Sequence, residues 1–126
     1  MKKVIINSSN APAPIGPYSQ AVLANGIMYL SGQIPADPAT GDLVGGDIRA
    51  QTRQVMNNIK AILEDSGLDM GCIVKTSIFL KSMDDFSEVN EEYSTFFSGN
   101  YPARETVEVA RLPKDVDIEI SVIALA

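Results

Sequence analysis

The sequence predicts an α+β fold in which two helices pack on one face of a mixed, mostly antiparallel sheet. Strand-like and helix-like segments follow one another in the order strands, helix, strand, helix, strands. Asn25-Gly26, the strongest short-range signal for a β-hairpin, separates two apolar segments. Two later segments repeat apolar residues at helical spacing between a polar cap and a glycine. The 126 residues show no repeat or linker, so residues 1–126 are expected to form a single domain.

The first half of the chain alternates short apolar segments with loops. The first loop holds three prolines and a glycine, which predicts a fixed irregular backbone. The second loop is rich in proline, glycine and aspartate. In order, we expect a strand over 3–6, a loop over 10–17, paired strands over 18–24 and 27–32, and a loop over 33–46.

The second half contains both predicted helices. Asp47 is expected to cap the first, which should run to about Ser66 and stop at Gly67. Ser82 with Asp85 resembles a capping box, which predicts a second helix to about Ser98. Strands are expected over 73–80, 103–111 and 116–124.

The strand at 73–80 suggests an assembly, because both of its faces are apolar. Val74, Ile78 and Leu80 are expected to point one way, and Ile73 and Phe79 the other. Two helices can cover only one face of a sheet, so the second face is expected to contact another subunit. The alternative is that this face is partly exposed to water.

The amino-acid composition limits the kinds of ligand and of catalysis that are expected. The net charge of −6 disfavours non-specific binding to nucleic acids, so no nucleic-acid partner is expected. There is no histidine, so acid–base work falls to Asp, Glu, Tyr, Lys or water, and with a single cysteine a zinc site is not expected. No nucleotide-binding glycine pattern is present, so no cofactor is predicted. The lone cysteine and the lack of a long apolar segment fit a cytoplasmic protein without a membrane span.

Arg104 and Glu119 are the first candidates for a site. Arg104 and Thr106 share one face of a predicted strand, and Glu119 lies on the polar face of the next. If those faces line one cleft, the guanidinium can hold a carboxylate bidentately while Glu119 orients water. The alternative is an ordinary salt bridge between Arg104 and Glu119 on a solvated face.

Several separated motifs resemble the Rid family, also called YjgF-like proteins. The clearest is YPAR at 101–104 followed by VEVARLP at 107–113. GPYSQ at 16–20 and SGQIP at 31–35 resemble the two N-terminal motifs of that family. The match covers nearly the whole chain and is closest to the reactive-intermediate deaminase branch.

The resemblance implies a chorismate-mutase-like fold and a homotrimer with sites in clefts between subunits. It also implies hydrolysis of 2-aminoacrylate and 2-iminobutanoate to 2-oxo acids and ammonia, the activity of a 2-iminobutanoate/2-iminopropanoate deaminase, without cofactor or metal. In this reading Arg104 binds the substrate carboxylate and Glu119 positions water. The further substrate-binding residues it implies are Tyr18, Ser31, Gly32, Asn90 and Thr106.

Some of these residues have simpler explanations, and the function has alternatives. Tyr18 could pack on a neighbour, Ser31 could satisfy a turn, and Asn90 could bridge within its helix. Thr106 replaces a cysteine that is common in the family, so no thiol nucleophile is available there. The alternatives are a regulatory protein that binds small carboxylates such as 2-oxo acids without turnover and, less favoured, an endoribonuclease or translation inhibitor.

Overall fold

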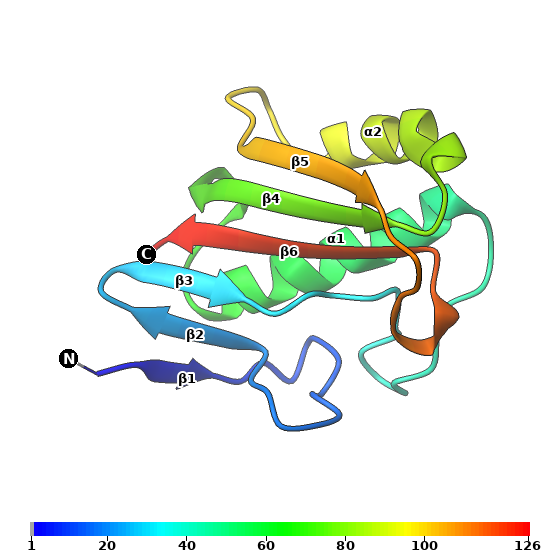
Figure 1. Cartoon of the computed structure of the whole chain (residues 1–126). Helices are drawn as coiled ribbons and strands as arrows, with labels where there is room; N and C mark the ends of the chain where they lie inside the picture. Colours follow the sequence, from blue (N-terminus) through cyan, green and yellow to red (C-terminus); the bar gives the residue numbers. More distant parts are fainter. Residues whose placement is uncertain (1) are drawn as a thin grey trace.

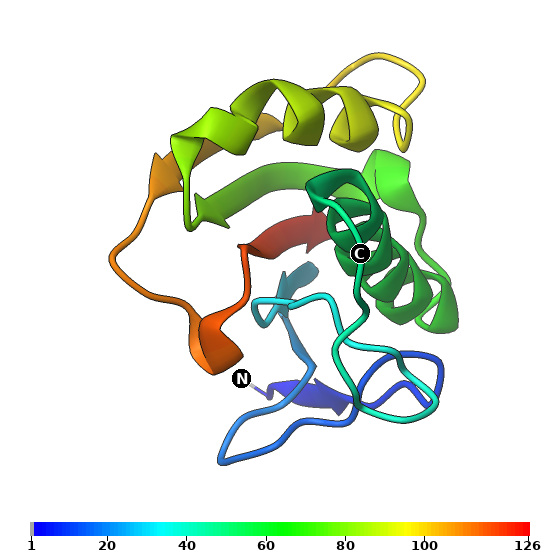
Figure 2. The ribbon, with the colours of Figure 1, turned by 90° about the vertical axis from the view of Figure 1, so that its right-hand side faces the viewer.

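The structure, a computed structural model, describes residues 2–126. Six strands form one sheet in the order β1-β2-β3-β6-β4-β5, and two α-helices cover one of its faces (Figures 1 and 2). The strands are β1 (Val4–Ile6), β2 (Ala21–Ala24), β3 (Ile27–Leu30), β4 (Ile73–Leu80), β5 (Ala103–Glu108) and β6 (Ile118–Leu125). The helices are α1 (Ile48–Asp65) and α2 (Phe86–Ser94), with 3-10 turns η1 (Met70–Cys72), η2 (Met83–Asp85) and η3 (Pro113–Asp115).

The sheet is mixed, as predicted. All neighbouring strands are antiparallel except β4 and β5, which are parallel. Parallel neighbours need a crossover connection, and α2 provides it. This crossover leaves β5 at one edge of the sheet, beside α2 (Figure 1).

The Asn25-Gly26 hairpin is confirmed. Both residues have left-handed backbones, with φ of 57° and 75°, as a two-residue turn of type I′ requires. Ala24 and Ile27 are direct partners across the turn. The paired strands are shorter than the predicted 18–24 and 27–32.

Helix α1 begins and ends where the sequence predicts. The Asp47 carboxylate accepts a hydrogen bond from the Ala50 N–H at 2.9 Å. The chain leaves the helix at Ser66, and Gly67 has a φ of 78°, in the left-handed region that favours glycine. The buried face of α1 packs on the sheet and comprises Ile48, Thr52, Val55, Met56, Asn58, Ile59, Ile62 and Leu63.

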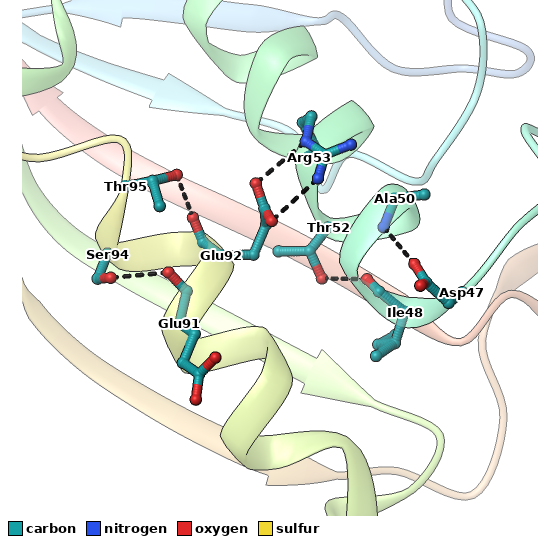
Figure 3. A network of polar contacts seen from close by, with 9 residues as sticks. All are labelled: Asp47, Ile48, Ala50, Thr52, Arg53, Glu91, Glu92, Ser94 and Thr95. Atoms are coloured by element: carbon teal, nitrogen blue, oxygen red, sulfur yellow. Dashed lines mark hydrogen bonds and ion pairs between the residues drawn. The ribbon is translucent and has the colours of Figure 1, made fainter.

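The second helix is shorter than predicted, and the predicted capping box at Ser82 and Asp85 is wrong. The Ser82 hydroxyl accepts from the Asp84 N–H and starts a 3-10 turn, while Asp85 makes no capping bond with its side chain. Helix α2 then ends at Ser94, before Gly99. The Ser94 and Thr95 hydroxyls donate to helix carbonyls three residues back (Figure 3), which accompanies the change to turns.

Ion pairs join α1 to α2. Arg53 binds the Glu92 carboxylate with two nitrogens, each at 3.1 Å (Figure 3). Arg49 pairs with Glu91 at 2.6 Å. These contacts help to hold α2 over β4 and β5, which carry part of the candidate site.

The face opposite the helices is partly apolar. Contrary to the prediction, Ile73 is buried and Val74 is exposed, because a register shift between Ile73 and Lys75 changes the alternation of side chains. From Lys75 onward the alternation is regular. The exposed apolar side chains of this face are Ile5, Tyr29, Val107 and Leu125.

Candidate active site

The structure places Arg104 and Glu119 on opposite faces of the sheet. Arg104 is the register partner of Thr76, and Glu119 is the register partner of Phe79. Thr76 and Phe79 are three residues apart on β4, so their side chains point to opposite faces. Neither residue forms an ion pair within residues 2–126. The alternative of a salt bridge between them on one face is therefore wrong.

Four of the predicted site residues meet in one cavity, which we call the loop pocket. Its volume is about 590 Å³. The residues that line it come mainly from the segment 12–20, the loop after β3 and the turn at η3. Its lining comprises Pro12, Ala13, Ile15, Tyr18, Gln20, Ser31, Gly32, Gln33, Ile34, Ala36, Gly41, Pro113, Lys114 and Glu119. It therefore combines an apolar wall with a few polar groups, as ligand pockets do.

Glu119 lies against the backbone of Gly32. A Cβ placed on Gly32 would be 2.5 Å from Glu119 Oε2 and 2.7 Å from its carboxyl carbon. The backbone of Gly32 does not need a left-handed conformation. Any side chain at position 32 would therefore force the Glu119 side chain to move.

Burial raises the pKa of the Glu119 carboxyl above its ordinary value. No charge or hydrogen bond contributes to this shift. A carboxylate whose pKa moves toward neutrality is better matched to proton transfer at neutral pH. Glu119 is the one carboxyl residue in the lining of the loop pocket.

Tyr18 and Ser31 are fixed by the backbone of the pocket walls. The Ile15 N–H donates to the Tyr18 hydroxyl at 3.2 Å, and the Ser31 hydroxyl donates to the Ser19 carbonyl at 2.5 Å. Ser31 therefore satisfies backbone groups, as the simpler explanation holds, and also lines the pocket. Half of the Tyr18 side chain remains exposed.

Gln20 anchors the proline loop. Its buried amide donates to the carbonyls of Ser8 and Pro12 at 3.0 and 2.9 Å and accepts from the Ser8 N–H. Gln20 lies in the GPYSQ motif at 16–20, and the family resemblance predicts no role for it. No periodic pattern could have indicated this role, because the bonds join residues of an irregular loop.

The other three predicted residues, Asn90, Arg104 and Thr106, lie between α2 and β5. Together with Phe86 and Tyr93 they form what we call the arginine cluster. The Arg104 guanidinium carbon is 5.1 Å from the centre of the Tyr93 ring and 5.8 Å from that of Phe86. The Tyr93 hydroxyl donates to buried Thr76 at 2.9 Å, which fixes the ring. Asn90 follows Phe86 by one helical turn on the same side of α2.

The arginine cluster contains unused hydrogen-bonding capacity. Asn90 Oδ1 and Thr106 Oγ1 are buried and have no hydrogen-bond partner among the described residues. Arg104 is half-buried, and no carboxylate pairs with it there. Buried polar groups are normally satisfied by a partner, so a water molecule or a polar ligand could bind to these atoms.

Lys114, which was not among the predicted site residues, also lines the loop pocket. It lies in the turn that joins two predicted strands, where spacing alone does not show a side chain's direction.

Across residues 2–126, no cluster of three or more His, Cys, Asp or Glu could hold a metal ion. None of the helices described is long and apolar enough to cross a membrane.

Comparison with known proteins identifies the class to which this fold and these residues belong. Residues 8–126 match the Endoribonuclease L-PSP family. A solved structure of a Rid family protein from Yersinia pestis superposes with a TM-score of 0.96 at 52% identity, over 99% of this chain and 100% of that one. The chain therefore belongs to this family, the Rid or YjgF family.

Individual relatives carry more specific names. A 2-iminobutanoate/2-iminopropanoate deaminase of Salmonella typhimurium is 53% identical over 123 residues, which is 95% of each chain. A RutC family protein of Pyrococcus horikoshii is 55% identical over 98% of each chain. The structure of TdcF from E. coli, with bound serine, has a TM-score of 0.93 at 43% identity over 98% of each chain.

Gly32→Ala should destabilise the protein through Glu119. The added methyl would displace the carboxylate, and overpacking of this kind costs about 1–3 kcal/mol. The free energy of unfolding, measured in urea, should fall for Gly32→Ala in the wild-type background. In a Glu119→Ala background the same substitution should cost much less. Equal costs in both backgrounds would show that the glycine serves another purpose.

Glu119→Gln should change how stability depends on pH. Because the folded pKa of Glu119 is raised, the folded state holds a proton that the unfolded state has already lost. The contribution of Glu119 to stability is therefore most favourable below the ordinary pKa of glutamate and is lost as pH rises through the raised value. Urea unfolding from pH 4 to 7 should show this decline in wild type and a smaller one in Glu119→Gln. Identical pH profiles would contradict burial of an ionisable Glu119.

Proposed function

We propose that this protein hydrolyses small 2-imino acids and their enamine tautomers, such as 2-iminobutanoate and 2-aminoacrylate, to 2-oxo acids and ammonia. The Salmonella typhimurium relative named for this activity supports the proposal. The proposal rests mainly on the arginine cluster. There the half-buried Arg104 guanidinium has no carboxylate partner, and Asn90 Oδ1 and Thr106 Oγ1 are buried without hydrogen-bond partners among the described residues. A guanidinium can bind a carboxylate bidentately, which fixes the ligand's orientation.

The two halves of the site come together, in this proposal, between subunits of a homotrimer. The arginine cluster lies at the β5 edge of the sheet, whereas Glu119 lies on the face opposite the helices. One chain's edge can meet the next chain's open face, and such a head-to-tail contact closes into a ring. The exposed apolar residues of the open face favour burial in this contact. A cytoplasmic location remains the expectation from the sequence.

Glu119 acts as the general base in the proposed reaction. It accepts a proton from a water molecule whose oxygen forms a bond to the imine carbon, and the C=N π electrons move to nitrogen. Proton transfer to that nitrogen makes it a leaving group. The C–N bond then breaks, ammonia departs, and the hydroxyl loses its proton to give the 2-oxo acid.

Positioning supplies much of the rate enhancement, because the imine carbon is already electrophilic. Arg104 holds the carboxylate, and Asn90 Oδ1 can accept an N–H from the substrate. The reaction needs no nucleophilic side chain, so Thr106 in place of a thiol is compatible with direct attack by water.

The second candidate function is binding without turnover. The TdcF structure with bound serine favours it, because that relative holds a small amino acid. The same arginine cluster would then bind a carboxylate ligand as a regulatory signal. RNA cleavage, to which the family's name refers, is the least favoured, since the net charge of −6 opposes binding to a phosphate backbone.

Arg104→Ala should lose most of the activity. The assay generates 2-iminobutanoate with a threonine dehydratase and follows 2-oxobutanoate above the spontaneous rate. Loss of a bidentate charged contact should lower kcat/KM by about 100-fold or more, and Arg104→Lys should restore only part of it.

Arg111→Ala is the matched control, because Arg111 is an exposed arginine that belongs to neither the arginine cluster nor the lining of the loop pocket. It should retain nearly full activity. The deaminase proposal fails if wild type does not accelerate the reaction or if Arg104→Ala is as active as wild type. Binding of 2-oxobutanoate by calorimetry without turnover would instead support the regulatory function.

A further inference from the structure

The turn that carries Lys114 has an unusual backbone. Lys114 and Asp115 both have a φ of 56°, although neither is glycine. Such conformations cost free energy and persist when surrounding contacts hold them. Lys81 pairs with Asp115 at 3.0 Å, and the Asp115 N–H donates to the Leu112 carbonyl at 3.0 Å. Contacts of Asp115 therefore stabilise the turn, while Lys114 lines the loop pocket.

The loop pocket contains one positive and one negative side chain that do not neutralise each other. Of its lining residues, only Lys114 and Glu119 carry a charge near neutral pH. Lys114 forms no ion pair within residues 2–126. Lys114 and Glu119 therefore form no ion pair with each other.

The amide and serine side chains of the loop pocket already donate hydrogen bonds within the chain. The amide of Gln20 donates to loop carbonyls, the Ser31 hydroxyl donates to Ser19, and the Gln33 amide donates to the Ser31 carbonyl. Lys114 is thus the one charged donor of the described lining that has no partner in the chain. Lys114 is an exposed residue of the lining, and an ammonium without an ion-pair partner is suited to bind an anion.

We infer that Lys114 binds a second anionic group, so that the site accepts 2-imino and 2-oxo acids whose side chain ends in a carboxylate. This inference rests on the proposed function, in which Arg104 binds the first carboxylate. The volume of about 590 Å³ leaves room for a side chain longer than that of a four-carbon acid. A carboxylate suits a single lysine better than a phosphate, because Glu119 in the same pocket would repel a doubly charged group.

The reaction on such a substrate is the same hydrolysis. Water adds to the imine carbon of 2-iminoglutarate, the C–N bond breaks, and the products are 2-oxoglutarate and ammonia. The side-chain carboxylate takes no part in bond making. Lys114 is accordingly a specificity-determining residue rather than a catalytic one.

The test compares two substrates in the full-length protein. 2-Iminoglutarate is generated from L-glutamate by an L-glutamate oxidase with catalase present, and 2-iminobutanoate by threonine dehydratase. Lys114→Asn removes the charge with a residue that tolerates the left-handed backbone. It should lower kcat/KM for 2-iminoglutarate about tenfold and for 2-iminobutanoate by about twofold or less. Lys114→Arg should restore most of the 2-iminoglutarate activity.

Lys81→Asn is the matched control, because it loosens the same turn by removing the Asp115 ion pair without taking a charge from the pocket lining. It should affect both substrates equally. The inference is overturned if Lys114→Asn also affects both substrates equally, or neither.

Calorimetry separates this inference from the proposed function. Wild type should bind 2-oxoglutarate about tenfold more tightly than 2-oxobutanoate, and Lys114→Asn should remove the difference. If wild type hydrolyses neither imine but shows this preference, the deaminase proposal fails and the second anion site stands. Equal affinities for the two oxo acids overturn the site even if 2-iminobutanoate is hydrolysed.

Discussion

The alternation of side chains across β4, β5 and β6 determines what this molecule can do alone. The register Thr76–Arg104 and Phe79–Glu119 places the guanidinium on the helix-covered face and the carboxylate on the open face. A one-residue slip would reverse both faces, but the buried residues of β4 and β6 hold the register. The proposed site therefore needs a second copy of the chain, so the proposed activity depends on assembly.

Several local features favour the site at the expense of stability. Glu119 is desolvated without a compensating charge, Asn90 Oδ1 and Thr106 Oγ1 are buried without partners, and Lys114 has a left-handed backbone. Each feature is unfavourable in isolation. The framework that supports them is conventional: a capped α1, bidentate pairing of Arg53 with Glu92, and a continuous apolar core. The unfavourable groups gather in the two regions to which the site is assigned.

The sequence predicted the parts of the fold that depend on local chemistry. The hairpin at Asn25-Gly26, the Asp47 cap and the mixed sheet were predicted from residue type, spacing and the order of the elements, and the structure confirms them. The Ser82–Asp85 capping box and the facing of Ile73 and Val74 were wrong, because a 3-10 turn and a register shift depend on tertiary contacts. The site residues came from motifs, whereas Lys114 and Gln20 lie in irregular loops where spacing does not define direction. Strand alternation itself could have separated Arg104 from Glu119 once the β4 register was known.

Mixing two inactive variants tests the shared site most directly. Arg104→Ala and Glu119→Ala chains, each inactive alone, are co-expressed or unfolded and refolded together, and hydrolysis of 2-iminobutanoate is measured. If each site takes Arg104 from one chain and Glu119 from its neighbour, random mixing in equal amounts restores about a quarter of the sites. If both residues act within one chain, every site lacks one of them, and the mixture stays as inactive as its components. Activity near a quarter of wild type is the result this account predicts, and an inactive mixture of properly assembled chains would contradict it.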